Sequence, residues 1–301
     1  MNLTVNKTSA ASLIFLFAFS ATAVPQEIFH GVDALVGNVS NAASGQFNAV
    51  VFLLAPVQGG PPDRRFACTG VFISRNVILT AAHCLDAAVE NPSGVTVWFG
   101  DIPNPADQPA ANLIAHAVKV IQHPEYSRQK DDHGIDLGIV VLPSGSAQGI
   151  APYPIFREVP KEGSEVVLVG YGSTKDRSIS GIKTYGSSKI QMVFSDSNHL
   201  DIHGETGGCP GDSGGPALLR DGTSSDFKVV GVAKSVADDT WSMASLSLYS
   251  RVDTQAGWID GFINQYDAQV EPRALVDMRP VPMNSARVGI DRVVAESLVR
   301  P

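Results

Sequence analysis

The chain has 301 residues, with 28 glycines, 19 prolines and only 17% charged residues. This composition favours a turn-rich β protein over a helical one, and the length allows one large domain or two modest ones. The formal net charge is −8 and no run of basic residues occurs, which argues against nucleic acid and anionic membranes as partners.

The N-terminal segment has the pattern of a secretory signal. Lys7 precedes an apolar run at residues 11–19, and Ala21-Thr22-Ala23 offers small residues to a signal peptidase. The run is too short to span a bilayer, and no later stretch reaches the roughly 18 apolar residues that a spanning helix needs. We therefore expect residues 1–23 to be a signal peptide, the mature protein to be secreted (extracellular or periplasmic), and no membrane anchor.

Three cysteines allow at most one intramolecular disulfide. In an oxidising compartment Cys68 and Cys84 are the natural pair, because they flank a short segment that is predicted to be a hairpin. Cys209 then remains, either as a buried apolar thiol or as an unpaired reactive one.

Short runs of β-branched and apolar residues, separated by turns, follow along the chain. They predict strands at residues 48–54, 70–74, 76–80, 95–100, 117–121, 137–142, 166–170, 188–193, 216–219, 229–233 and 245–252. Many short strands of this kind argue for β-barrels or sandwiches. One helix is predicted at residues 254–266, which carry an apolar face, and residues 267–301 are expected to form a tail or irregular extension.

Three segments carry candidate chemistry. Ser213 lies in Cys-Pro-Gly-Asp-Ser-Gly-Gly-Pro (residues 209–216), where glycines permit a tight turn and close approach of a substrate. A serine hydroxyl is a weak nucleophile unless a base takes its proton and a third group orients that base. His83, in Thr-Ala-Ala-His-Cys, and Asp136, at the start of an apolar strand, are the candidates. Taken singly, such a histidine or aspartate is more often structural.

Together, and in the order His, Asp, Ser, these segments resemble the chymotrypsin/trypsin-like serine endopeptidases. The resemblance extends from about residue 28 to residue 263. It implies an all-β fold of two packed six-stranded antiparallel β-barrels with a C-terminal helix, and an active site in the cleft between the barrels. Residues 28–155 would form the first barrel, with His83 and Asp136, and residues 156–266 the second barrel, with Ser213, and the helix.

The resemblance also assigns roles to residues. Ser213 would attack the scissile carbonyl, His83 would carry the proton and Asp136 would orient the imidazole, while the backbone N–H groups of Gly211 and Ser213 would form the oxyanion hole. Ile28 resembles the first residue of an activated family member, whose α-amino group would pair with Asp212. Residues 24–27 would then be a short propeptide. It ends in glutamate rather than arginine or lysine, so a glutamate-directed or other protease would have to remove it.

By the same resemblance, three residues are expected in the specificity pocket. Gly207 would lie at its base and brings no charge, which argues against cleavage after arginine or lysine. Val236 and Ser247 would form its walls and narrow it toward small or medium apolar side chains. As an alternative, Lys234 or His203 would attract an acidic side chain.

The expected partners are protein or peptide substrates, with protein protease inhibitors as further candidates. We expect a monomer that needs no cofactor and no metal. The alternative function is a catalytically silent, protease-like binding scaffold. An α/β-hydrolase esterase would need Ser before Asp before His and a βαβ pattern, and the sequence has neither.

Overall fold

The computed structural model of the protein describes residues 36–37, 39–41, 45–61, 64–100, 114–128, 134–147, 149–172, 181–195, 197–204, 206–220, 226–236, 247–267 and 293–294. For residues 36–37, 39–41, 236 and 293–294 only the backbone is described. The expected signal peptide, the expected propeptide, Ile28 and nearly all of the expected tail lie outside the described residues.

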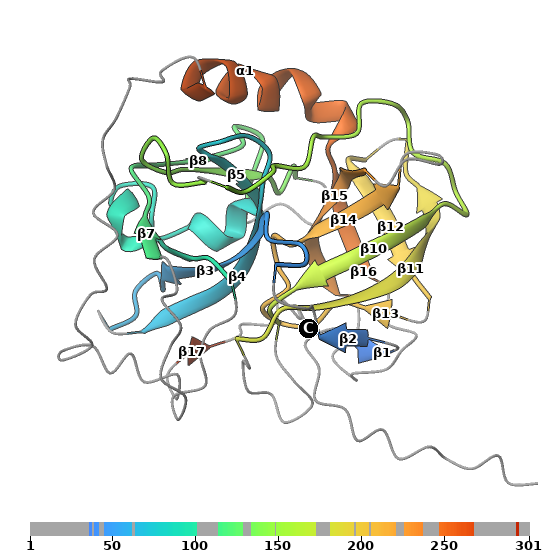
Figure 1. Ribbon diagram of the computed structural model, residues 1–301, viewed down its shortest axis with the longest axis horizontal. Coiled ribbons are helices and arrows are strands. Elements are labelled where there is room, and N and C mark those ends of the chain that lie inside the picture. Colours follow the sequence, from blue (N-terminus) through green and yellow to red (C-terminus); the bar gives the residue numbers. More distant parts are fainter. Residues whose placement is uncertain are drawn as a thin grey trace, which may run out of the picture. The chain divides into compact units, whose positions relative to one another are not determined.

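The N-terminal half of the described chain forms one antiparallel sheet (Figure 1). Its strands are β3 (Val50–Pro56), β4 (Arg65–Phe72), β5 (Val77–Thr80), β6 (Thr96–Trp98), β7 (Ile114–His116), β8 (Lys119–Gln122) and β9 (Gly138–Val141). They pair in the order β7-β6-β3-β4-β5-β9-β8, and no pairing within the described ranges joins β7 to β8. This sheet is therefore a half-barrel. A further short strand, β17 (Val293–Val294), lies parallel to β4.

The C-terminal half forms a closed six-stranded barrel. Its strands are β10 (Glu165–Gly170), β11 (Thr184–Val193), β12 (His199–His203), β14 (Pro216–Arg220), β15 (Phe227–Val236) and β16 (Ser247–Arg251). They pair in the order β10-β14-β15-β16-β12-β11, and β11 pairs with β10 to close the ring. β2 (Val39–Asn41) adds to β11, and β1 (Val36–Gly37) pairs with β13 (Thr206–Gly207). The predicted all-β, chymotrypsin-like fold class is confirmed.

Apolar side chains fill both sheets. The first core cluster is built around β3, β4, β5 and β9, whose side chains are buried on both faces along most of each strand. A second cluster, with Leu168, Ile190, Leu200 and Ile202 at its centre, fills the closed barrel. Burial on this scale is the main favourable term in folding. Short 3-10 turns, η1 (Ala82–Leu85), η2 (Pro92–Gly94) and η3 (Asp253–Gln255), link or precede other elements.

The predicted C-terminal helix is confirmed as α1 (Ala256–Asp267), which follows η3 directly. Ile259 is buried, and Trp258, Phe262 and Ile263 pack against the first core cluster. The ring of Trp258 lies 4.7 Å from that of His123, which follows β8. The helix therefore covers the half-barrel, although it follows the closed barrel in the chain (Figure 1).

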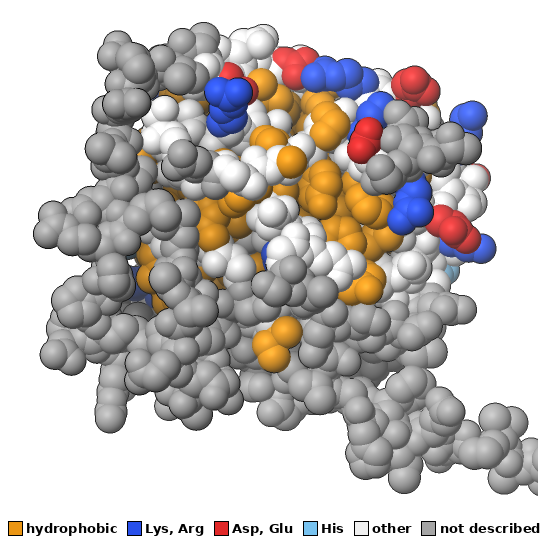
Figure 2. Space-filling model, in the orientation of Figure 1, with side chains coloured by type: hydrophobic (Ala, Val, Ile, Leu, Met, Phe, Trp, Pro, Cys, Tyr) orange, Lys and Arg blue, Asp and Glu red, His pale blue; other side chains and the backbone are white. Residues whose placement is uncertain are grey.

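On the face drawn in Figure 2, apolar side chains gather in the middle and charged side chains lie toward the upper and right-hand edges. Both signs of charge are mixed along these edges, so this face presents no broad patch of one sign among the described side chains. Within the described ranges, no helix has the length and apolar character needed to cross a membrane.

Candidate active site

The pairing of β5 with β9 brings His83 and Asp136 together. His83 lies in η1, three residues after β5 ends at Thr80, and Asp136 lies two residues before β9 begins. The register aligns Thr80 with Gly138. A Cβ atom at Gly138 would lie 3.1 Å from the backbone oxygen of Ala81, so glycine permits the close approach of the two segments.

The two side chains form a buried, hydrogen-bonded pair. His83 Nδ1 lies 2.6 Å from Asp136 Oδ2, and the backbone N–H of His83 donates to Asp136 Oδ1 at 2.9 Å. Ser250 Oγ donates to the backbone oxygen of Asp136 at 3.3 Å. Burial pushes the pKa of Asp136 upward, but the charge of His83 and its two hydrogen bonds outweigh this, and the pKa lies below its usual value. Asp136 is therefore held as a carboxylate.

Ser213 lies on a turn between β13 and β14 that needs its glycines. Gly211 and Gly214 have φ angles of 100° and 83°, in the left-handed region that favours glycine. The N–H of Gly214 donates to the backbone oxygen of Ala233 at 2.8 Å, and the N–H of Ala233 donates to Gly215 at 2.8 Å. These bonds attach the serine turn to β15.

The serine turn is also attached to the half-barrel, through Thr69 on β4. The N–H of Thr69 donates to the backbone oxygen of Ser213 at 2.8 Å, and Thr69 Oγ1 donates to that of Gly211 at 3.0 Å. The same Oγ1 accepts from the N–H of Tyr171 at 3.1 Å, and Thr80 Oγ1 donates to the oxygen of Thr69 at 2.8 Å. Thr69 thus links the two halves of the site. The sequence does not reveal this role, because an interior strand threonine carries no distinctive signal.

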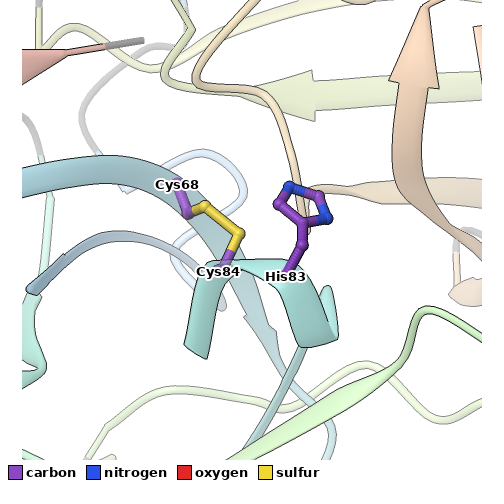
Figure 3. Close-up of side chains that lie close together, drawn as sticks. All are labelled: Cys68, His83 and Cys84. Carbon is purple, nitrogen blue, oxygen red and sulfur yellow. A yellow bond between two sulfur atoms is a disulfide. The ribbon is translucent and has the colours of Figure 1, made fainter. Parts of the chain in front are cut away.

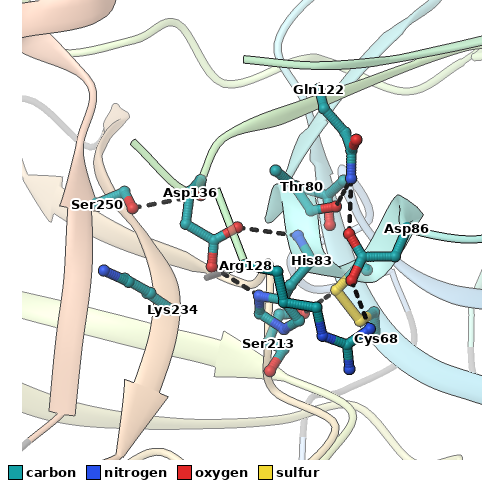
Figure 4. Close-up of polar contacts among 12 residues, drawn as sticks. Cys68, Thr80, His83, Asp86, Gln122, Arg128, Asp136, Ser213, Lys234 and Ser250 are labelled. Carbon is teal, nitrogen blue, oxygen red and sulfur yellow. Dashed lines mark hydrogen bonds and ion pairs between the residues drawn. A yellow bond between two sulfur atoms is a disulfide. The ribbon is translucent and has the colours of Figure 1, made fainter. Parts of the chain in front are cut away.

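Figure 4 shows Ser213 beside the ring of His83, with Asp136 on the other side of that ring. His83 Nε2 is buried and makes no hydrogen bond with any part of the chain that the structure describes. The structure therefore brings the three predicted catalytic residues to one place. A serine hydroxyl requires a proton acceptor, and His83 Nε2, the nitrogen on the free side of the imidazole, lies at the serine turn.

The predicted disulfide between Cys68 and Cys84 is present and joins β4 to η1 (Figure 3). His83 lies next to it, so the two sulfurs and the imidazole form a compact group. Sulfurs joined in a disulfide are not thiolates and are poor metal ligands. The group is therefore explained by the disulfide and not by a metal site. Cys209, the third cysteine, is buried.

Asp212 is buried directly before Ser213. Its Oδ1 accepts from the N–H of Gly172 at 2.8 Å and its Oδ2 from that of Cys209 at 2.9 Å. Burial raises the pKa of Asp212 to about 8, although both hydrogen bonds act in the opposite direction. A carboxyl group in such a place is stabilised as an anion by a cationic partner. Ile28, the predicted partner, lies outside the described residues.

The predicted pocket residues lie on neighbouring strands. Val236 and Ser247 are register partners on β15 and β16, and Ser247 Oγ accepts from the N–H of Gly208 at 3.0 Å. Gly207, the neighbour of Gly208, is buried in β13. The chain thus brings Ser247 to the expected base of the pocket and Val236 opposite Ser247.

The two candidates for attracting an acidic substrate side chain are engaged elsewhere. Lys234 Nζ lies 2.9 Å from His199 Nε2, and both residues are buried. His203 Nδ1 lies 2.9 Å from Asp201 Oδ1 on the same strand, β12. From the sequence, Lys234 is expected only as a pocket residue and nothing points to His199, because the contact between β12 and β15 side chains is set by the barrel.

A sequence profile described as Trypsin matches residues 36–259. The serine protease SP24D of Anopheles gambiae is 30% identical over 251 residues, which cover 79% of this chain and 84% of that protein. The phenoloxidase-activating enzyme 1 of Spodoptera litura is 30% identical over 233 residues, 66% of this chain and 59% of that enzyme. The chain spans about half of vitamin K-dependent protein C of Rattus norvegicus, at 26% identity over 48% of that protein.

Among solved structures, the fold is similar to that of neuropsin, a serine protease expressed in the limbic system of mouse brain. The TM-score is 0.58 at 17% identity, over 75% of this chain and 99% of neuropsin. At that identity the likeness concerns the fold alone. The profile and the 30% identical relative settle the family: the chain belongs to the trypsin-like serine proteases.

Proposed function

We propose that the protein is a secreted serine endopeptidase that cleaves peptide bonds through an acyl-enzyme intermediate. The observation that carries the proposal is the buried contact of 2.6 Å between His83 Nδ1 and Asp136 Oδ2, with Nε2 on the side of Ser213. Nδ1–H donates to the carboxylate, so Nε2 is left as the acceptor that a general base needs.

In this mechanism Ser213 Oγ attacks the scissile carbonyl carbon while its proton moves to His83 Nε2. The tetrahedral oxyanion is stabilised by the backbone N–H groups of Gly211 and Ser213, and Asp136 stabilises the imidazolium. His83 then gives the proton to the leaving amine, and the acyl-enzyme forms. Water, activated by the same imidazole, hydrolyses the ester and regenerates Ser213. Activity is lost in acid, where the imidazole is already protonated.

We propose a substrate preference for small or medium apolar side chains. Gly207 brings no charge to the expected base of the pocket, and Ser247, bonded to the N–H of Gly208, narrows it. The Lys234 side chain is hydrogen-bonded to His199, and the His203 side chain is hydrogen-bonded to Asp201. Neither Lys234 nor His203 therefore favours selection of an acidic substrate side chain.

We further propose that cleavage after Glu27 frees Ile28, and that its ammonium group pairs with Asp212. The buried position of Asp212 and its raised pKa support this pairing, because an opposite charge offsets the cost of burying the carboxylate. The proposed substrates are proteins or peptides, with protein protease inhibitors as further partners. The proposed mature enzyme is a monomer with two domains, residues 28–155 with the half-barrel and residues 156–266 with the closed barrel and the helix.

The test is a cleavage profile on a diverse peptide library, with protein that begins at Ile28 and a Ser213→Ala variant beside it. We expect cuts after small or medium apolar residues in the first protein, and a fall in kcat of about 10⁶-fold in the variant. Cuts mainly after arginine, lysine or acidic residues would refute the pocket assignment alone. If the two proteins behave alike, the endopeptidase proposal is wrong and the binding-scaffold alternative takes its place.

A further inference from the structure

Lys234 is a buried lysine close to the serine turn. It follows Ala233, the β15 residue that exchanges backbone hydrogen bonds with Gly214 and Gly215. Its exposed fraction is 8%. An ammonium group is costly to bury unless other groups compensate for its lost water. The surroundings of Lys234 must therefore supply that compensation.

One compensating group is His199 on β12. The distance between Lys234 Nζ and His199 Nε2 is 2.9 Å. An ammonium group only donates hydrogen bonds, so His199 Nε2 must accept, which makes the imidazole of His199 neutral with its proton on Nδ1. The lysine is thus held by a group that orients it without cancelling its charge.

The barrel directs this pair toward Asp136. On β12, β16 and β15, His199, Ser250 and Val232 lie in one row of register partners. Leu200 and Tyr249, the next residues, belong to the barrel core, so His199 and Ser250 project from the opposite face. Ser250 Oγ reaches the backbone of Asp136, which identifies this face as the one that packs on the Asp136 segment. Lys234 joins the face through its contact with His199.

The charge of Lys234 acts on the carboxylate. It is one of the influences that lower the pKa of Asp136, after burial, which raises it, and after His83, which lowers it. Figure 4 shows Lys234 and Ser250 on barrel strands on the same side of Asp136, with His83 on the other side. Burial raises the pKa of the Tyr126 phenol, and the charges of Asp86 and then of Asp136 add to this rise, so Tyr126 is a further titratable group near the carboxylate. On β12, Asp201 is paired with His203.

We propose that Lys234, held in place by His199, is a positioning residue that keeps Asp136 ionised and fixed against His83. The inference rests on the proposed catalytic roles of His83, Asp136 and Ser213. It gives the carboxylate a neighbour in each half of the fold: the imidazole of His83 in the half-barrel and the ammonium group of Lys234 in the closed barrel. The lysine supports the anion, but it also opposes protonation of the imidazole. Removal of Lys234 takes a positive charge away from this pair, so protonation of the imidazole is expected to become easier in a variant that lacks the lysine.

The first test compares Lys234→Met and Lys234→Arg with Lys189→Met. Lys189 is an exposed lysine on β11, so Lys189→Met removes the same charge away from the site. Lys234→Met should move the acid-side midpoint of the kcat/KM profile to higher pH by about 0.5–1 unit and lower kcat about tenfold. Lys234→Arg should restore the midpoint, and Lys189→Met should leave it where it is. A midpoint that is the same in Lys234→Met and Lys189→Met overturns the proposal.

A second measurement is independent of catalysis and of substrate choice. In a Ser213→Ala background, NMR of labelled histidines follows the ring signals of His83 with pH. The same upward shift of the titration is expected for Lys234→Met and not for Lys189→Met. His199→Gln, which retains an acceptor for Nζ, should behave like the parent, and His199→Leu should behave like Lys234→Met if both variants fold.

The two measurements separate this inference from the proposed function. If the protein with Ser213 cleaves nothing, but the His83 signals still shift in Lys234→Met, the endopeptidase proposal fails and the positioning role stands. If the protein cleaves peptides, but neither the profile nor the His83 signals respond to Lys234→Met, the positioning role is refuted. Where Lys234→Met does not fold, the comparison of His199→Leu with His199→Gln decides, because only His199→Leu removes the acceptor for Lys234 Nζ and must then move the midpoint; equal midpoints in these two variants refute the positioning role.

Discussion

Thr69→Val tests whether the hydroxyl that links the two halves of the site matters. Thr69 is fully buried on β4. Its Oγ1 donates to the backbone oxygen of Gly211 and accepts from the N–H of Tyr171. Valine has nearly the same shape but cannot make either bond. The substitution therefore leaves one acceptor and one donor buried, both of them beside the serine turn.

The expected cost follows from these two groups. Each buried polar group without a partner costs about 1–3 kcal/mol, so the loss of two partners should lower the free energy of unfolding by about 2–6 kcal/mol. With a urea m-value of about 3 kcal/mol per molar, the unfolding midpoint should fall by about 0.7–2 M. The serine turn should also lose order, because the backbone oxygen of Gly211 loses the hydrogen bond from Thr69 Oγ1 that helps to fix it.

The assay compares the parent, Thr69→Ser and Thr69→Val. Thr69→Ser keeps the hydroxyl and serves as the matched control for the lost methyl group. Urea unfolding followed by tryptophan fluorescence measures stability, and titration of Ser213 with an acylating inhibitor measures the competent fraction of the site. We expect Thr69→Val alone to be strongly affected in both. If Thr69→Val and Thr69→Ser give the same midpoint and the same reactive fraction, the link through Thr69 has no energetic role.

Three further predictions concern other parts of the site. Burial raises the pKa of Asp212 from 3.8 to about 8, so in a chain whose residue 28 is not a free N-terminus the free energy of unfolding should fall by of the order of 5 kcal/mol as pH rises through that interval. Urea titrations at a series of pH values measure this fall. Asp212→Asn should abolish it, and a chain that begins at Ile28 should show a smaller fall. Gly214→Ala should lower the free energy of unfolding by about 3 kcal/mol in thermal unfolding, because the φ of +83° disfavours alanine and the new Cβ would press on the backbone of β4. Gly145→Ala is the control: its φ is +85°, but the space around it is open, so it should show only the smaller cost of the backbone conformation. Replacing both bridged cysteines by serine should cost about 3 kcal/mol, since the bridge closes a loop of 16 residues; equal urea midpoints with and without the bridge would contradict this.

Much of the fold could be predicted because its strands are short, apolar and separated by turns. The strands around His83 and Asp136 are buried on both faces, so their apolar runs are unmistakable. β12 was missed because His199, Asp201 and His203 alternate with only two apolar residues, Leu200 and Ile202. That alternation is typical of a strand with one polar face, but over so few residues the sequence pattern cannot be distinguished from that of a polar turn.

The site could be predicted only as far as its chemistry lies in local segments. The histidine, aspartate and serine segments carry their own signals, whereas Thr69 and Lys234 gain importance from neighbours more than 30 residues away. Thr69 contacts Gly211 across the interface of the two halves, and Lys234 contacts His199 across the barrel. Such contacts depend on register and closure of the sheets, which no single segment of sequence determines.

The exchange of segments between the two halves has a consequence for how the chain folds. The half-barrel receives α1 from the end of the catalytic region, and the closed barrel receives β2 from its beginning. Neither half contains all the segments of its own structure. During synthesis the half-barrel therefore cannot complete its core until the closed barrel has been made, because Trp258 and Ile259 follow the closed barrel in the chain. A chain cut between residues 143 and 160 should therefore yield two fragments that fold only when mixed, and the acquisition of structure and of the assembled site should be a single late event.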